Sequence, residues 1–181
     1  MDKKEKDNFT CEDQKYLTLF EYAKEINSNE FERFARLDSK AGGYITANSI
    51  LMAILIFILP SFIEIFNGIN NEILRFLLFL LLFISFIFIV LGFILSYSVL
   101  KIQPMHNMKI DDDMLSFFQS NSLIDINFAL ARRYQEISKN NYDSNENKAK
   151  IMSISFWFNL FAVFASVLLL LIIIINKIQG E

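Results

Sequence analysis

Residues 76–100 read FLLFLLLFISFIFIVLGFILSYSVL, an unbroken apolar stretch without a charged side chain. A helix needs about 20 predominantly apolar residues to cross the hydrocarbon core of a bilayer. Residues 41–63 and 151–176 are also free of charge, and a water-soluble helix would instead alternate apolar and polar faces. We therefore predict an all-α membrane protein with three transmembrane helices, at 41–63, 76–100 and 151–176.

The distribution of lysine and arginine predicts how these helices are oriented. Residues 1–40 hold eight of the 17 basic residues and residues 101–150 hold seven, whereas 64–75 and 177–181 hold one each. Because cytoplasmic loops carry the excess of basic residues, we place the helical N-terminal region 1–40 and the loop 101–150 in the cytoplasm. The short connection 64–75 and the tail 177–181 then lie outside.

The residue counts argue against several kinds of chemistry. The chain has one cysteine, Cys11, and one histidine, His106, which is too few for a multi-thiolate metal site or an intramolecular disulfide. None of the five glycines belongs to a phosphate-binding loop, and acidic residues balance the basic ones in both cytoplasmic segments, which disfavours a nucleic-acid surface. We expect a protein that is not an enzyme and that has no cofactor, metal or nucleic-acid partner.

Apolar residues recur at helical spacing in both cytoplasmic segments, which predicts a helical collar. The polar run 27–30 predicts a break between two helices, with Asn29 capping the second, and Gly42-Gly43 predicts a hinge in the long helix that enters the bilayer. In the long loop, Asp111 to Asp113 and Ser122 are typical helix starts. Pro104 is expected to end the second membrane helix.

Polar stripes run along the first and third membrane helices. Small residues allow close helix contact, and an amide inside a membrane needs a hydrogen-bond partner. The stripes therefore predict either helix packing or a pore lining. Packing between identical subunits would be compatible with both interpretations. The third helix presents Lys148, Met152, Ser155, Asn159, Ala162 and Ser166 on one face, and the first presents Gly42, Thr46, Ser49 and Ala53 with Asn48 beside them.

Two sets of charged residues are further candidates. Glu64 and Arg75 lie at the outer ends of the first two membrane helices and are expected to pair across the hairpin, or to form a charged ring in an oligomer. Guanidinium groups bind phosphate in a planar fork, so the cytoplasmic cations predict an anion site, unless nearby acids neutralise them. These cations are Arg33, Arg36, Lys40, Arg132 and Arg133.

An acidic-x-Lys-Ala unit precedes both outward-going helices, as Asp38-Ser39-Lys40-Ala41 and Glu146-Asn147-Lys148-Ala149. If this is a repeat, the two elements are expected to pack side by side. Residues 31–51, FERFARLDSKAGGYITANSIL, resemble the segment that opens the first membrane helix of the Pycsar transmembrane effectors and the related SLATT-type effectors. The residues that match this motif are Asp38, Lys40, Ala41, Gly42 and Asn48.

The resemblance implies an effector of a bacterial anti-phage system in the inner membrane, with a cytoplasmic N-terminus. Such a protein would form homo-oligomers and respond to a cyclic nucleotide or related second messenger, made by a neighbouring nucleotide cyclase or nucleotidyltransferase. It would then open a channel or otherwise permeabilise the membrane and cause abortive infection. The alternative is a non-catalytic membrane scaffold or an inhibitory partner of another protein.

Overall fold

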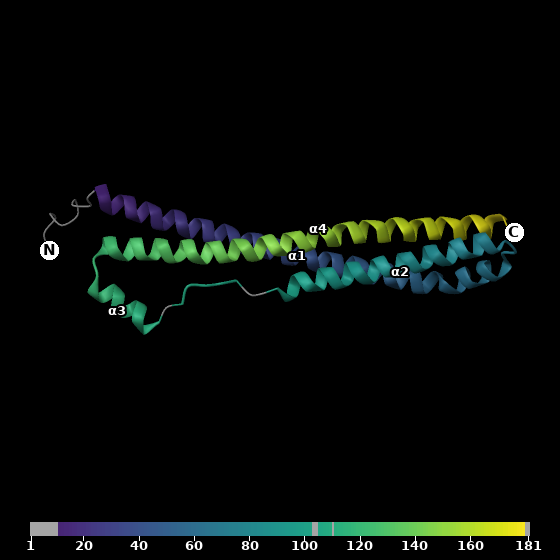
Figure 1. Ribbon diagram of the computed structural model, residues 1–181, viewed down its shortest axis with the longest axis horizontal. Helices are drawn as coiled ribbons and strands as arrows, with labels where there is room; N and C mark the ends of the chain where they lie inside the picture. The colour runs from purple at the N-terminus through teal and green to yellow at the C-terminus, as the bar shows by residue number, and fades with distance from the viewer. Residues whose placement is uncertain (1–10, 103–104, 110, 180–181) are drawn as a thin grey trace. The chain divides into compact units, whose positions relative to one another are not determined.

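The computed structural model describes residues 11–102, 105–109 and 111–179, and the regular structure in these ranges is entirely helical. Four helices follow one another along the chain: α1 (Cys11–Gly68), α2 (Glu72–Lys101), α3 (Asp112–Ser120) and α4 (Leu123–Gln179) (Figure 1). Three of them, α1, α2 and α4, are long and apolar enough to cross a membrane. The prediction of an all-α protein with three such helices is confirmed for the described residues.

The chain divides into two compact units. Unit 1 contains residues 1–36 and 103–147, and unit 2 contains residues 37–102 and 148–181. Helices α1 and α4 each contribute to both units without a break, α3 belongs to unit 1, and α2 belongs to unit 2. The charge-free windows of the sequence all lie in unit 2.

Helix α1 continues through every position at which an interruption was predicted. The predicted break at residues 27–30 is wrong, because Asn27 is buried and its side chain bonds Asn141 of α4 instead of capping a helix. Gly42 and Gly43 are helical, and no described glycine has a positive φ angle. Pro60 also lies inside α1, which ends at Gly68.

The other helix ends follow the capping chemistry of the sequence. Asn71 caps α2 by accepting from the amides of Ile73 and Leu74. The Asp111 carboxylate accepts from the amide of Met114, and the Ser122 hydroxyl accepts from the amide of Asp125. The predicted starts of α3 and α4 are thus confirmed, whereas α2 ends at Lys101 and Pro104 lies outside the described residues.

The core of unit 2 is mainly apolar. Its larger cluster lies toward the α1–α2 connection, and its buried members are Leu55, Ile58, Phe62, Leu78, Ile89, Ala162, Leu169 and Ile173. A smaller cluster at the opposite end joins Ala41, Val99 and Met152. Many large apolar side chains are exposed on the outside of these helices, for example Phe57 at 85%, as expected for surfaces that face lipid.

Candidate functional site

A line of polar and small residues, partly joined by hydrogen bonds, runs through the interior of unit 2, and we call it the polar seam. Its members are Asn48 of α1, Ser85, Gly92 and Ser96 of α2, and Ser155, Asn159 and Ser166 of α4. The hydroxyls of Ser96 and Ser155 lie 2.7 Å apart, and those of Ser85 and Ser166 lie 2.8 Å apart. Ser155 also contacts the carbonyl oxygen of Gly92 at 3.2 Å. The seam therefore connects α2 to α4 at two levels.

The stripe on the third membrane helix supplies the α4 side of this seam. Ser155, Ala162 and Ser166 are buried, and Asn159 is partly buried, donating to the Ser155 hydroxyl at 3.4 Å. Within one chain, this stripe makes helix–helix contacts. Ser85 was not singled out from the sequence, although it lies on one face of α2 with Ile89, Gly92, Ser96 and Val99, at the same spacing as the α4 stripe.

The stripe on the first membrane helix faces the other way. Ser49 and Ala53 are exposed, and the hydroxyls of Thr46 and Ser49 bond carbonyl oxygens of their own helix. Only Asn48, beside the stripe, points into unit 2, where its side chain is 1% exposed. The two stripes therefore have different environments: one is used inside the chain, and the other remains open to lipid or to a neighbouring subunit.

Two amides of the seam meet at Gly92. A Cβ atom added to Gly92 would lie 2.3 Å from Asn159 Oδ1 and 3.3 Å from Asn48 Nδ2, so a larger residue does not fit without displacing them. Asn159 Oδ1 and both side-chain polar atoms of Asn48 are buried without a hydrogen-bond partner in the described structure. Buried polar groups without partners are costly, so this amide layer lowers the stability of unit 2 unless it has another role.

The two acidic-x-Lys-Ala units meet at the charged end of unit 2. The Lys148 ammonium lies 2.7 Å from Asp38 Oδ1, and the Lys148 side chain is fully buried while that of Asp38 is 32% exposed. Ala41 packs in the small apolar cluster, whereas Lys40 is exposed and Gly42 is partly exposed. The predicted side-by-side arrangement of the two elements is found in this ion pair.

Unit 1 has its own polar contacts between α1 and α4. Arg33 forms an ion pair with Glu146, and this hydrogen bond raises the pKa of the Arg33 guanidinium. One residue earlier along α4, the buried Asn145 amide donates to the carbonyl oxygen of Glu30 at 2.9 Å and to its carboxylate at 2.8 Å. These bonds hold the two helices in one register.

Asn141 ties three segments of unit 1 together. Its fully buried amide accepts from the His106 backbone at 2.9 Å, and donates to the His106 carbonyl and to Asn27 Oδ1, each at 3.1 Å. The segment 105–109, which lacks regular structure, is thereby attached to the helix pair.

Replacing Asn141 with leucine should destabilise unit 1 by about 2 kcal/mol, because three neutral hydrogen bonds are lost and the buried Asn27 carbonyl keeps no amide donor from α4. Limited proteolysis should then cut near residues 105–109 at lower protease concentration. Asn140→Leu is the matched control, since Asn140 is exposed one position away. Equal protease sensitivity of the two variants would contradict this role of Asn141.

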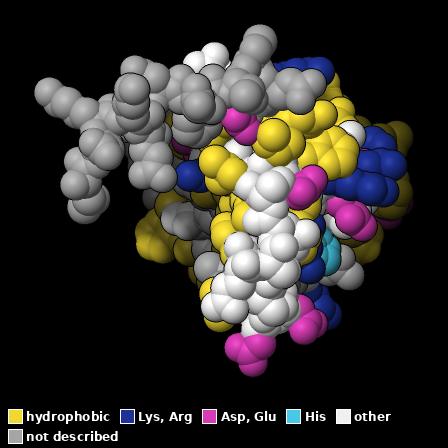
Figure 2. Space-filling view, turned by 90° about the vertical axis from the view of Figure 1, so that its left-hand side faces the viewer, with side chains coloured by type: hydrophobic (Ala, Val, Ile, Leu, Met, Phe, Trp, Pro, Cys, Tyr) yellow, Lys and Arg dark blue, Asp and Glu magenta, His cyan; other side chains and the backbone are white. Residues whose placement is uncertain are grey.

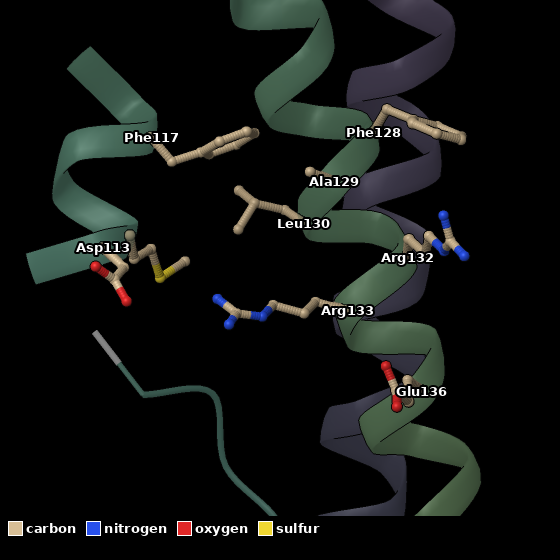
Figure 3. A pocket seen from close by; sticks show the side chains of 9 residues that line it. Asp113, Phe117, Phe128, Ala129, Leu130, Arg132, Arg133 and Glu136 are labelled. Atoms are coloured by element: carbon tan, nitrogen blue, oxygen red, sulfur yellow. The ribbon is translucent and has the colours of Figure 1, made fainter. Parts of the chain in front are cut away.

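The five cations that were expected to bind one anion lie in different places. Arg33 is paired with Glu146, Arg36 contacts Glu32 at 3.4 Å, and Lys40 is exposed in unit 2. Arg132 and Arg133 extend from opposite sides of α4, and only Arg133 reaches toward Asp113 of α3 (Figure 3). A cavity of about 570 Å³ lies between these two helices. Both Arg132 and Arg133 line this cavity, and Arg133 is the one that points toward α3.

Acidic, basic and hydrophobic side chains are interspersed on the face that Figure 2 shows. No extended surface of one charge is visible among the described residues in that view. Arg33 and Arg36 each form an ion pair with a nearby glutamate.

The predicted ion pair between Glu64 and Arg75 does not form. Arg75 donates to the carbonyl oxygen of Ile69 at 2.5 Å and lies over the ring of Phe66. Glu64 is exposed on α1, and no ion pair within the described ranges includes it. The short connection uses the arginine to bind its own backbone, because free carbonyl oxygens at the end of α1 need donors.

Comparison of the chain with protein-family models, with curated proteins and with solved structures finds no match. The resemblance of residues 31–51 to anti-phage effectors therefore stays a prediction.

Proposed function

We propose that this chain is a membrane effector of bacterial antiviral defence that permeabilises the inner membrane when a nucleotide second messenger acts on its cytoplasmic part. In this proposal unit 1 is the cytoplasmic regulatory part and unit 2 is the membrane part. The chain assembles with copies of itself, and membrane permeabilisation leads to abortive infection. A nucleotide cyclase or nucleotidyltransferase would supply the signal.

The observation that carries this proposal is the polar seam. Polar side chains inside membrane segments either join helices by hydrogen bonds or line the pathways of ions and solutes. Asn48 and Asn159 lie within otherwise apolar helices and keep polar atoms without partners. The serine pairs already join α2 to α4, so the unpaired amide atoms add nothing to a purely structural membrane anchor, whereas an effector that rearranges its helices exposes them to water when it opens.

The continuity of α1 and α4 supports coupling between the two parts. Each helix runs from unit 1 into unit 2 without an interruption, so a change in helix packing in one unit is transmitted along the same backbone. A ligand shifts the equilibrium only if it binds one packing better than the other. The cavity between α3 and α4, with Phe117 for stacking and Arg133 for charge, is where we place a nucleotide (Figure 3).

Assembly between copies is supported by the open stripe on α1. Thr46, Ser49 and Ala53 are exposed small residues of that stripe in unit 2, and small residues allow membrane helices to approach closely. The seam on α4 is already used within the chain, which leaves the α1 face as the contact between subunits.

Purified protein in liposomes should release a trapped dye about tenfold faster when an activating cyclic nucleotide is added. A nucleotide that binds one helix packing about 1.4 kcal/mol more tightly than the other shifts the equilibrium between them by that factor. Ala53→Leu should weaken both oligomer formation and release, since a bulky side chain blocks close helix approach. Phe76→Leu, at a side chain of α2 that is 63% exposed, is the control. An absence of dye release with every nucleotide tested, in samples shown to be oligomeric, would exclude permeabilisation.

A scaffold or inhibitory partner is the second candidate, and one groove of unit 1 favours it. The groove, of about 690 Å³, lies between α1 and α4 and is lined by exposed apolar side chains, including Leu19, Tyr22 and Phe128. Such a surface suits a partner protein. Expression in a bacterial host separates the two functions: an effector should be toxic by itself, whereas a scaffold should be harmless and should suppress the toxicity of a neighbouring protein.

A further inference from the structure

Helix α3 carries large apolar side chains on two faces, and its own chain uses only one of them. Phe117 points toward α4 across the cavity between the two helices (Figure 3), and Met114 is buried there. Leu115 and Phe118, three residues apart on the outer side of α3, are 53% and 44% exposed. In a helix of nine residues, an exposed leucine beside an exposed phenylalanine indicates a contact with another surface.

The groove between α1 and α4 offers an apolar surface into which such a helix fits. Leu19, Tyr22 and Phe128 line this groove, and all three are exposed. Along α4 the groove extends from Phe128 to Tyr142, which is about 21 Å at the rise of a helix, whereas the nine residues of α3 span about 14 Å. Helix α3 is therefore short enough to lie within the groove.

The charges of the two surfaces are complementary. Asp112, the middle of three successive aspartates, precedes Leu115 by one turn on the outer face of α3 and is exposed. The groove presents Arg132 and Lys139, which are also exposed. Within the described ranges, no ion pair includes Asp112 or either of these cations. Glu30 also lines the groove, but its carboxylate already accepts from an asparagine of α4. The groove thus attracts an acidic helix end.

The position of α3 along α4 allows it to reach the groove of a neighbouring copy. Within its own chain, α3 faces α4 at residues 129–136, and the groove uses α4 residues 128–142. Copies inserted into a membrane in one direction are related by rotation about the membrane normal, which keeps each segment at its own height. Because the exposed face of α3 points away from its own α4, the groove that it can fill belongs to a second copy.

We infer that α3 of one copy docks its outer face, formed by Asp112, Leu115 and Phe118, into the groove between α1 and α4 of the next copy. The two surfaces differ, so the contact is head-to-tail, and its repetition about one axis closes a ring. The contact joins subunits through unit 1. It deepens the self-assembly included in the proposed function and rests on that part alone, because docking requires neither a nucleotide nor permeabilisation.

Crosslinking between two differently tagged full-length chains, reconstituted together in liposomes in the Cys11→Ser background, tests this contact. A short bismaleimide should join Leu115→Cys of one chain to Tyr22→Cys of the other at least about fivefold more efficiently than it joins Ser116→Cys to Tyr22→Cys, because docked thiols have a high effective concentration. Ser116 is the matched control, since it is exposed one position away from Leu115, on another face of α3. Equal yields would overturn the inference, and the groove would then be open to a different protein.

Charge reversal provides a second measurement with the same pair of thiols. Asp112→Lys in the first chain should lower the crosslink yield about threefold, and Arg132→Glu with Lys139→Glu in the second chain should restore at least about half of the loss. An unchanged yield with Asp112→Lys, or no recovery, would contradict docking of the acidic helix end. A specific crosslink in liposomes that release no dye would disprove permeabilisation and leave the contact in place, whereas dye release without the crosslink would disprove the contact alone.

Discussion

The variant Asp38→Ala should lose about 3 kcal/mol of stability, because it removes the carboxylate from a lysine that has no access to solvent. Lys148 is fully buried, and its ammonium lies 2.7 Å from the Asp38 carboxylate. Without that carboxylate the buried positive charge keeps its desolvation penalty and loses the attraction of Asp38. Unfolding in detergent micelles, followed by helical circular dichroism, measures the change.

The opposite substitution should cost less. Lys148→Met removes the buried charge and leaves Asp38, whose side chain is 32% exposed and able to bind water, so we expect a loss of about 1 kcal/mol. The double variant should be more stable than Asp38→Ala alone. Glu32→Ala is the control, since Glu32 and Arg36 form an exposed pair that should contribute less than about 1 kcal/mol. If Lys148→Met lost more stability than Asp38→Ala, the ion pair with Asp38 would not be what allows Lys148 to be buried.

The membrane architecture was predictable because the apolar windows and the capping residues act locally. Asn71, Asp111 and Ser122 satisfy backbone amides within four residues of their own positions, and such contacts need no knowledge of the tertiary structure. The same locality explains the wrong prediction at residues 27–30. Asparagine favours helix ends, but Asn27 lies within a helix because its side chain bonds buried Asn141, which is 114 residues away in the sequence.

The candidate site was only partly predictable for a related reason. The spacing of Ser155, Asn159 and Ser166 indicated one face of a helix, but spacing does not say which neighbouring helix that face meets. The partners are Ser85 and Ser96 of α2, and a serine in an apolar helix is a weak signal because it can bond its own backbone, as Ser98 does with Ile94. The arginines show the same limit, since residues adjacent in sequence, Arg132 and Arg133, extend from opposite sides of α4.

Gly92→Leu should be the most damaging apolar substitution in α2, although leucine is a better helix former and suits a lipid environment. Even the first atom of the new side chain would lie 2.3 Å from Asn159 Oδ1 and 3.2 Å from its Cγ. The helices must separate or the amides must leave the seam, so we expect a loss of about 3 kcal/mol, at the upper end for overpacking. Thermal unfolding in micelles, together with crosslinking between α2 and α4, detects both effects.

The control and the rescue make this prediction specific to the amide layer. Gly43→Leu adds the same atoms at an exposed position with nothing within 4 Å of the new Cβ, so it should leave stability unchanged or raise it by up to about 1 kcal/mol. In the smaller variant Gly92→Ala, adding Asn159→Ala removes the atoms that collide and should restore about half of the lost stability. If Asn159→Ala instead lowers the stability of Gly92→Ala by as much as it lowers that of the unmodified chain, the two side chains do not compete for one space. The close approach of α2 and α4 at Gly92 would then not be the reason that larger residues are destabilising there.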